Sequence, residues 1–266
     1  MAAGKKLNTR RTVLLGLTSA AAGNIVIGGT ENANAVGKPM EGGDEVPPEM
    51  LADGARRVTT GESIAISFDP DLCIHARFCV LWEPRVFIAR EGPWIEPDRG
   101  TTETTAATIR NCPSGALQYI RRDQGPGEQP PMINVLYLRE NGPLAFRGSL
   151  SLYGRSIGYR ATLCRCGKSA KMPYCDRSHN VTNFQSTGEA PSVDSPKLAQ
   201  RGGSIEIVPI RDGPLVVDGN IEICSGTGRT IKRSAGDVLC RCGQSKSKPF
   251  CDGSHIVTNF RADGQG

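Results

Sequence analysis

A set of three cysteines and one histidine occurs twice in the second half of this chain, with the same spacing in both copies. The pattern is Cys-x-Cys-x8-Cys-x3-His, and its members are Cys164, Cys166, Cys175 and His179, then Cys240, Cys242, Cys251 and His255. Four soft or borderline ligands in one short loop are typical of a four-coordinate metal site. A disulfide framework would have no reason to repeat a histidine. Zinc and an iron–sulfur cluster both fit this ligand set, although zinc sites more often use a Cys-x2-Cys spacing.

A third set of candidate ligands lies nearer the N-terminus. Cys73 and Cys79 stand six residues apart with His75 between them, and Cys112 follows within a Cys-Pro pair. The bacterial ferredoxin pattern has three cysteines at intervals of three residues. Cys73 and Cys79 stand at its first and third positions, but Ala76 stands at the second. Three thiolates suffice for a [3Fe–4S] cluster, whereas a [4Fe–4S] cluster needs a fourth ligand, either His75 or an exogenous one. A structural zinc ion, or a disulfide with a free thiol, is the alternative.

These three sets include nine of the ten cysteines and all three histidines. The tenth cysteine, Cys224, ends the apolar run that begins at Ile221. Small unpaired cysteines are common in protein cores. We therefore expect Cys224 to be a core residue and not a ligand.

The elements expected to position the third set form a small α+β unit over residues 63–122. Apolar and β-branched runs predict strands at Ile64–Phe68, Trp94–Ile95 and Leu117–Ile120, and the stretch Thr102–Arg110 predicts a helix. The proline after Cys112 would end this helix and aim the thiolate. This order of elements fits a ferredoxin-like fold.

The two later sets belong to an internal repeat. The Gly-Pro-Leu element at residue 142 recurs 71 residues later at 213, and the Leu-Cys-Arg-Cys-Gly element at 163 recurs 76 residues later at 239. The second copy therefore has five extra residues before its first cysteine. We assign residues 132–188 to the first copy and 203–266 to the second, each a β-rich unit. Apolar and β-branched runs predict short strands at Ile133–Leu138 and Leu150–Leu152 in the first copy, and at Ile205–Ile210 and Ile221–Ile223 in the second. Breaker-rich stretches at 124–131 and 186–203 are the expected linkers.

The first 35 residues are typical of an export signal. Paired arginines, Arg10 and Arg11, precede a charge-free run from Thr12 to Thr30, and an Ala-x-Ala element ends at Ala35. This resembles the twin-arginine type of signal, which carries folded proteins with cofactors already loaded. We expect export or periplasmic localisation after cleavage at Ala35, with residues 36–62 as a linker and no stable membrane span afterwards. A membrane anchor and a cytoplasmic tail are the alternatives.

Composition narrows the possible functions. The 266 residues carry a formal net charge of +5, of which +3 lies in residues 1–35. Only 5% of residues are aromatic, and no basic stripe interleaved with aromatic residues stands out. Nucleic-acid binding is therefore not expected. No nucleotide or flavin fingerprint is present in the sequence, so we expect a non-enzymatic electron carrier rather than an enzyme with its own substrate.

The repeated loops resemble the CDGSH (NEET) iron–sulfur family through Cys251-Asp252-Gly253-Ser254-His255. The resemblance covers residues 132–266. It implies that each loop holds a [2Fe–2S] cluster, with two cysteines on one iron and a cysteine and a histidine on the other. It also implies that two copies in one chain form a pseudo-dimer within a monomer. The first copy departs from the family pattern because Arg177 replaces the glycine, which usually marks a left-handed backbone position.

Residues 63–122 resemble the divergent 4Fe–4S mono-cluster domain through the Cys-x-His-x3-Cys, Pro-Trp and Cys-Pro-x-Gly-Ala-Leu elements. The expected cofactors are thus two [2Fe–2S] clusters and one [3Fe–4S] or [4Fe–4S] cluster. Three redox centres in one chain favour electron transfer to a redox partner protein. Cluster transfer to an acceptor, or redox and pH sensing through the histidine ligands, is the first alternative. A structural zinc-binding module is the second.

Overall fold

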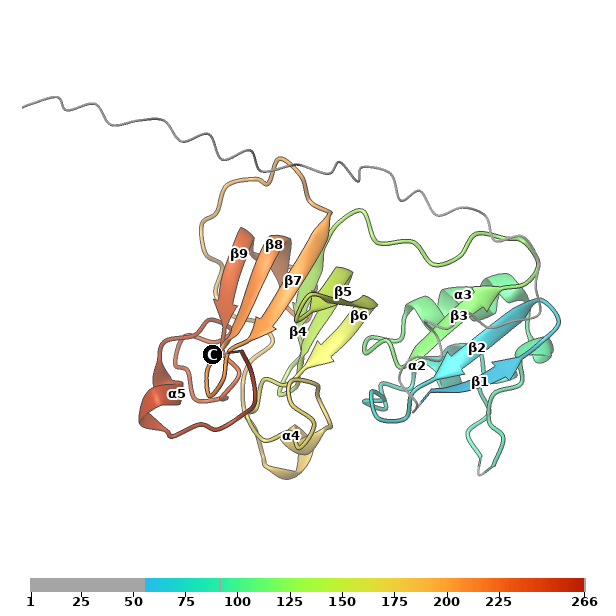
Figure 1. Cartoon of the computed structure of the whole chain (residues 1–266), viewed down its shortest axis with the longest axis horizontal. Helices are drawn as coiled ribbons and strands as arrows, with labels where there is room; N and C mark the ends of the chain where they lie inside the picture. The colour runs from blue at the N-terminus through green and yellow to red at the C-terminus, as the bar shows by residue number, and fades with distance from the viewer. Residues whose placement is uncertain (1–55, 91, 266) are drawn as a thin grey trace, which may run out of the picture. The chain divides into compact units, whose positions relative to one another are not determined.

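A computed structural model describes residues 56–90 and 92–265 of the protein (Figure 1). The predicted export signal and the predicted linker up to residue 55 lie outside these residues. In the described part of the chain, no helix combines the length and the apolar character needed to cross a membrane. Strands predominate, and the longest helix there, α3 (Thr102–Arg110), has nine residues.

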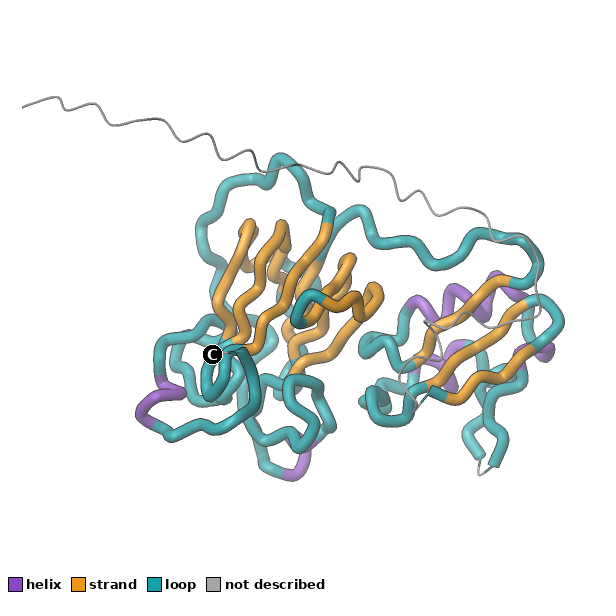
Figure 2. The backbone as a smooth tube through the Cα atoms, viewed as in Figure 1, coloured by secondary structure: helices purple, strands orange, loops and turns teal. Residues whose placement is uncertain are grey.

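The N-terminal domain is built on a three-stranded antiparallel sheet (Figure 2). Its strands are β1 (Arg57–Thr60), β2 (Ile64–Phe68) and β3 (Leu117–Arg121), with β2 in the centre. The connection from β2 to α3 contains helix α2 (Phe78–Trp82) and the 3-10 turn η1 (Pro97–Arg99). Two of the predicted ligands, Cys73 and Cys79, belong to this connection.

Helix α3 places the third predicted ligand of this domain. The Thr101 hydroxyl accepts the backbone N–H of Thr104 at 3.2 Å and so caps the N-terminus of the helix. Ala106 and Ile109 on its buried face pack into the same core as Ile64 and Ile66 of β2. Because the helix ends at Arg110, Cys112 stands in the turn that leads into β3.

The predicted strand β2 and helix α3 are confirmed residue for residue, but two expectations were wrong. Strand β1 lies within residues 36–62, which were expected to be linker. It is a polar edge strand whose ends are exposed, so it carries little apolar signal. The expected strand at Trp94–Ile95 is only an isolated bridge between Ile95 and Phe87, because two residues are too few to form a ladder.

The two repeats have the same order of strands and share one six-stranded sheet. The first repeat contains β4 (Val135–Leu138), β5 (Leu144–Leu152) and β6 (Arg155–Leu163), and the second contains β7 (Ser204–Pro209), β8 (Leu215–Cys224) and β9 (Thr230–Leu239). Within each repeat, the first strand pairs with the second and the second with the third, always antiparallel. The sequence patterns located four of these strands in part and missed β6 and β9.

Reciprocal parallel pairings join the repeats. Strand β4 pairs with β8 through Leu136 and Ile223, and β7 pairs with β5 through Leu150 and Ile205. Each long middle strand therefore pairs with its own first strand along one half and with the other repeat's first strand along the other half. Both repeats contribute residues to one apolar core, so each repeat depends on the other to bury its apolar side chains. Cys224 is 5% exposed within β8, as expected of a core residue.

Candidate metal centres

In each repeat, the four predicted ligands lie together as two pairs. The Sγ atoms of Cys164 and Cys166 are 3.6 Å apart, and Cys175 Sγ lies 3.5 Å from His179 Nδ1. The matching distances in the second repeat are 3.7 and 3.4 Å. Within the described ranges, no three His, Cys, Asp or Glu side chains gather as closely as a single metal ion requires. Two pairs of donors fit a two-iron centre with one pair on each iron.

An aspartate closes the turn that carries the last two ligands of each repeat. The Asp252 carboxylate accepts the backbone N–H groups of Lys246 at 2.8 Å and Ser254 at 3.0 Å, and the Ser254 hydroxyl at 2.6 Å. Asp176 makes the same three bonds in the first repeat. Hydrogen bonds from Ser254 and Lys246 hold the pKa of Asp252 well below its usual range. These carboxylates therefore act as ionised acceptors that fix the turn.

The residue after each aspartate adopts the left-handed conformation that was expected there. Arg177 has φ +72° and ψ +9°, and Gly253 has φ +84° and ψ −1°. The short helices α4 (Ser178–Val181) and α5 (Ser254–Val257) begin immediately afterwards and carry the histidines. A non-glycine residue in this region costs on the order of 1 kcal/mol. The first repeat thus retains a strained residue where the second has none.

A fully buried arginine stands between the first two cysteines of each repeat. The side chain of Arg165 donates to the backbone carbonyls of Arg139, Gly142, Ser186 and Thr187, and that of Arg241 donates to those of Ile210, Gly213 and Asp263. Each guanidinium also faces a phenylalanine ring. Burial lowers the pKa of Arg165 to about 10, which leaves it a cation at neutral pH, and burial also lowers the pKa of Arg241. A fixed buried cation suits a site lined by thiolates.

The two ligand loops touch through their backbones. A Cβ atom on Gly167 would lie 2.2 Å from the carbonyl oxygen of Cys242, and a Cβ on Gly243 would lie 2.5 Å from that of Cys166. Both glycines also have positive φ angles, of +74° and +78°. No larger residue fits at either position. Because each glycine meets the backbone of the other loop, the contact is reciprocal and the two loops lie directly against each other.

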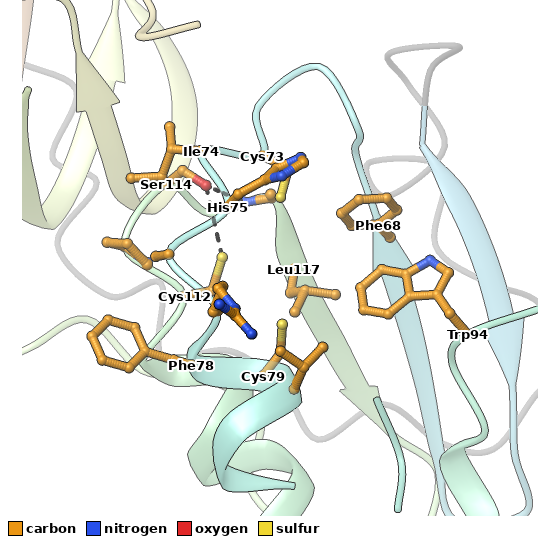
Figure 3. Close-up of a pocket in the computed structure, with 15 residues that line it drawn as sticks. Phe68, Cys73, Ile74, His75, Phe78, Cys79, Trp94, Cys112, Ser114 and Leu117 are labelled. Atoms are coloured by element: carbon orange, nitrogen blue, oxygen red, sulfur yellow. Dashed lines mark hydrogen bonds between the residues drawn. The ribbon is translucent and has the colours of Figure 1, made fainter. Parts of the chain in front are cut away.

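The three cysteines of the N-terminal domain line a single cavity of about 350 Å³ (Figure 3). Cys73 follows β2, Cys79 is on α2 and Cys112 follows α3, and His75 lines the same cavity. Phe68 and Trp94 pack edge to face, with ring centroids 4.8 Å apart, and form part of its apolar wall. One water molecule needs only about 10–15 Å³ of this kind of volume. The cavity therefore leaves room for a group larger than one metal ion.

Burial favours the protonated form of four candidate thiols in the absence of a metal. It raises the pKa of Cys73, and it raises the pKa values of Cys79, Cys175 and Cys242 to about 11. Cys164 behaves differently, because a hydrogen bond from Cys166 lowers its pKa to about 6. A coordinating metal deprotonates its thiol ligands outright. Assembly of these centres would therefore release protons.

Sequence reasoning did not identify Arg160 of β6, which is 4% exposed. Its guanidinium donates to the backbone carbonyl of the predicted ligand Cys112 at 3.0 Å and to that of Leu117 at 3.2 Å, and forms an ion pair of 2.7 Å with Glu128. The sequence offered one signal for it: the position that matches Arg160 in the second repeat is Gly236, so the two repeats differ there. Arg160 thus connects the first repeat to the turn that holds Cys112.

Both parts of the described structure match known families. Residues 59–122 match the family described as divergent 4Fe-4S mono-cluster, and residues 141–180 and 212–256 each match the family described as iron-binding zinc finger CDGSH type. The uncharacterized protein YjdI of Escherichia coli strain K12 is 39% identical over 71 residues, which are 27% of this chain and 93% of that relative. The YjdI protein of Escherichia coli O157:H7 matches equally well.

The fold, the ligand sets and these matches together define an iron–sulfur protein. The chain belongs to the tandem CDGSH proteins that carry an N-terminal divergent 4Fe–4S mono-cluster domain.

Proposed function

We propose that the protein is an electron carrier with three iron–sulfur centres. Cys164, Cys166, Cys175 and His179 would hold one [2Fe–2S] cluster, and Cys240, Cys242, Cys251 and His255 a second. Cys73, Cys79 and Cys112 would hold a [3Fe–4S] cluster, or a [4Fe–4S] cluster with His75 or an exogenous fourth ligand. When bound, such clusters store and release single electrons. The redox partner is another protein, and the chain itself needs no substrate site.

The observation that carries this proposal is the two-plus-two arrangement of the donors, which recurs in both repeats. The paired distances of 3.4 to 3.7 Å suit donors that share one iron in pairs. The buried arginines supply positive charge beside the thiolates without donating a proton. The backbone contact between Cys166 and Gly243 supports a pseudo-dimer within one chain, in which the two loops would lie side by side. The sheet of the N-terminal domain with α3 against it is consistent with a ferredoxin-like unit.

Anaerobic purification of the full chain tests the proposal. We expect a red-brown protein with iron and acid-labile sulfide, and EPR of the reduced and oxidised forms that resolves three centres. A colourless protein with stoichiometric zinc would instead establish the structural zinc module. Elution as a monomer on size exclusion would agree with a pseudo-dimer inside one chain.

Cluster transfer or pH sensing is the second candidate function, because the histidine of each ligand set is half-buried while the first cysteine of the set is fully buried. His179 and His255 are both partly exposed, whereas Cys164 and Cys240 are each 1% exposed. Protonation of Nδ1 competes with iron, so these ligands would leave first. Incubation with an apo-ferredoxin separates the two functions. Loss of absorbance from this protein and gain of a cluster by the acceptor would favour transfer over electron carriage.

We also propose export through the twin-arginine-like signal of residues 1–35. The support is the sequence alone: the paired arginines, the mild apolar run and the Ala-x-Ala end. N-terminal sequencing of the protein recovered from a periplasmic fraction should begin at Val36. Recovery of the uncleaved chain from the cytoplasm or from membranes would favour the corresponding alternative.

A further inference from the structure

The last strands of the two repeats form the two edges of the shared sheet (Figure 1). Among the strands of this sheet, β6 pairs with β5 and β9 pairs with β8, so each is an edge strand. The N-terminal domain contacts the β6 edge closely, since a Cβ atom on Gly115 would lie 2.5 Å from the backbone carbonyl oxygen of Arg160. The position of β9 that matches Arg160 is Gly236, which is exposed. One edge is therefore covered at this point and the other is open.

An open hollow lies over the β9 edge. Its lining includes Asp218, Gly236, Val238 and the predicted ligand Cys251. A group that occupies the hollow would therefore lie beside the second candidate centre. Val238 is 44% exposed and offers apolar surface for such a group to cover.

The two edges have opposite polarity at matching positions. In the first repeat, the sheet supplies donors, because Arg147 and Arg160 donate to backbone carbonyls of the N-terminal domain at 2.9 and 3.0 Å. These two positions face each other across β5 and β6, and in the second repeat they are Asp218 and Gly236, which face each other across β8 and β9. Asp218 is exposed and has no ion-pair partner among the described residues. Here the sheet supplies an acceptor, so the occupant must supply the donor.

Gly236 leaves room for a side chain that comes from another protein. In the first repeat, the long side chain of Arg160 takes up the matching position. A Cβ atom on Gly236 would lie 3.8 Å from Oδ1 of Asp218, so a group placed over Gly236 borders that carboxylate. A cationic side chain in this place would pair with Asp218.

The basic residues of the second repeat leave the charge of Asp218 in place. Lys232 lines the hollow, but its Nζ atom is already paired with Asp237 at 2.9 Å. Lys246 and Lys248 belong to the ligand loop and are not part of the lining. The hollow thus combines a free carboxylate with apolar surface, which suits a docking surface with a basic residue among apolar ones.

We propose that this hollow is the docking site of a redox partner protein that inserts a lysine or arginine over Gly236 and pairs it with Asp218. The inference rests on the proposed electron-carrier function and names the kind of partner. One electron leaves the reduced centre beside Cys251 and enters the partner's oxidised one-electron acceptor. The centre is thereby oxidised and the acceptor reduced, and no bond or proton is transferred.

Cytochrome c, a redox protein with a lysine-rich surface, is the probe for this site. With the anaerobically purified full chain, calorimetric titration should show binding that weakens as salt rises. Asp218→Asn should raise the dissociation constant about two- to fivefold, as the loss of one exposed ion pair would. Gly236→Arg, which copies the first repeat, should abolish binding. Glu62→Gln removes an exposed negative charge from the N-terminal domain and is the control that should bind like the wild type.

Carbodiimide cross-linking gives a readout that needs no cluster. The reagent joins a carboxylate to an amine in contact with it, so mass spectrometry should find a cytochrome c lysine linked to Asp218. Cross-links confined to other carboxylates, or equal weakening by E62Q, would overturn the inference. Equally tight binding of an acidic ferredoxin would overturn it as well. A dimer of the chain that D218N dissociates would also do so, because the hollow would then hold a second copy.

Stopped-flow reduction of cytochrome c separates the inference from the proposed function. Electron transfer from the reduced chain that slows in D218N and G236R supports both. Binding that depends on Asp218 without electron transfer would keep the docking site but refute the electron carrier. Electron transfer that is unchanged in both variants would keep the carrier and refute the docking site. Asp218→Asn is an isosteric change at an exposed position, so the test does not depend on the folding of G236R.

Discussion

The two repeats are alike where they build a ligand loop and different where they face the rest of the protein. Both use a buried arginine between two cysteines, an aspartate that closes the turn, and a glycine that admits the opposite loop. These features all serve local geometry, which a cluster of fixed shape demands equally from each copy. The residues of each ligand loop therefore reflect the needs of the metal centre, and not the contacts of the surrounding surface.

The faces beside the loops have diverged. In the first repeat, Cys175 is 3% exposed and Arg160 nearby is bonded into the N-terminal domain. In the second, Cys251 is partly exposed and lines an open hollow together with Asp218 and Asp237. The same fold thus presents one covered face and one open face. This difference indicates that one copy serves an internal contact and leaves the other available to solvent.

Replacing Arg160 should have the largest effect on this comparison. Arg160→Ala removes the donor to the carbonyls of Cys112 and Leu117 and leaves Glu128 without its partner. Breaking such a buried ion pair costs about 3–5 kcal/mol. We expect the free energy of unfolding to fall by this amount in denaturant titrations, with earlier loss of the mono-cluster absorbance. The exposed Arg155 of the same strand is the control, and Arg155→Ala should change stability by less than about 0.5 kcal/mol. Equal effects of the two variants would refute the proposed role of Arg160.

Replacing the buried arginines tests whether the two ligand loops are equivalent. Arg165→Met and Arg241→Met keep the side-chain volume but leave the carbonyls of Gly142 or Gly213 without their donor. An unsatisfied buried acceptor costs about 1–3 kcal/mol. We expect similar losses of unfolding free energy in the two variants, each with a lower yield of bound iron. A large difference between them would mean that the loops are not equivalent.

The sequence was sufficient for elements whose signal is local. The strand at Ile64–Phe68 and the helix at Thr102–Arg110 could be predicted from their own residues, and the ligand spacing located both repeated loops. The left-handed position at Arg177 could be inferred because glycine occupies it in the other copy. Strands β6 and β9 were missed, because Arg160, Gly158 and Gly236 break their apolar pattern. Such residues are explained by partners far away in the sequence, which no local window contains.

The same limit applies to the candidate sites. The donors of each repeated loop lie within sixteen residues, so their spacing carries the information. The reciprocal pairing of β4 with β8 and of β7 with β5 depends on residues about 55 to 90 positions apart, and nothing in either strand specifies its partner. Arg160 reaches Cys112 across 48 positions. Long-range polar contacts of this kind depend on the assembled fold.

Exchange of the histidines tests whether both loops use a labile ligand. In His179→Cys and His255→Cys, a thiolate replaces Nδ1 beside Cys175 or Cys251. A histidine ligand competes with protons near its ordinary pKa of about 6.5, so we expect each variant to keep its visible absorbance to a pH lower by roughly one unit. Acidification followed by absorbance measures this. Unchanged loss of absorbance would show that the replaced histidine is not a ligand.

Substitutions at the left-handed position of each loop are expected to have the smallest effect on stability. Arg177→Gly removes the strain of an arginine at φ +72°, and Gly253→Arg introduces it at φ +84°. The first should therefore raise the free energy of unfolding by about 1 kcal/mol and the second lower it by about the same amount, as measured by chemical denaturation of the apo protein. If R177G fails to stabilise the chain, other interactions of the Arg177 side chain offset its backbone strain. In that case G253R should still be destabilising. Opposite and equal changes would instead show that the backbone strain of Arg177 has no compensation in the apo protein.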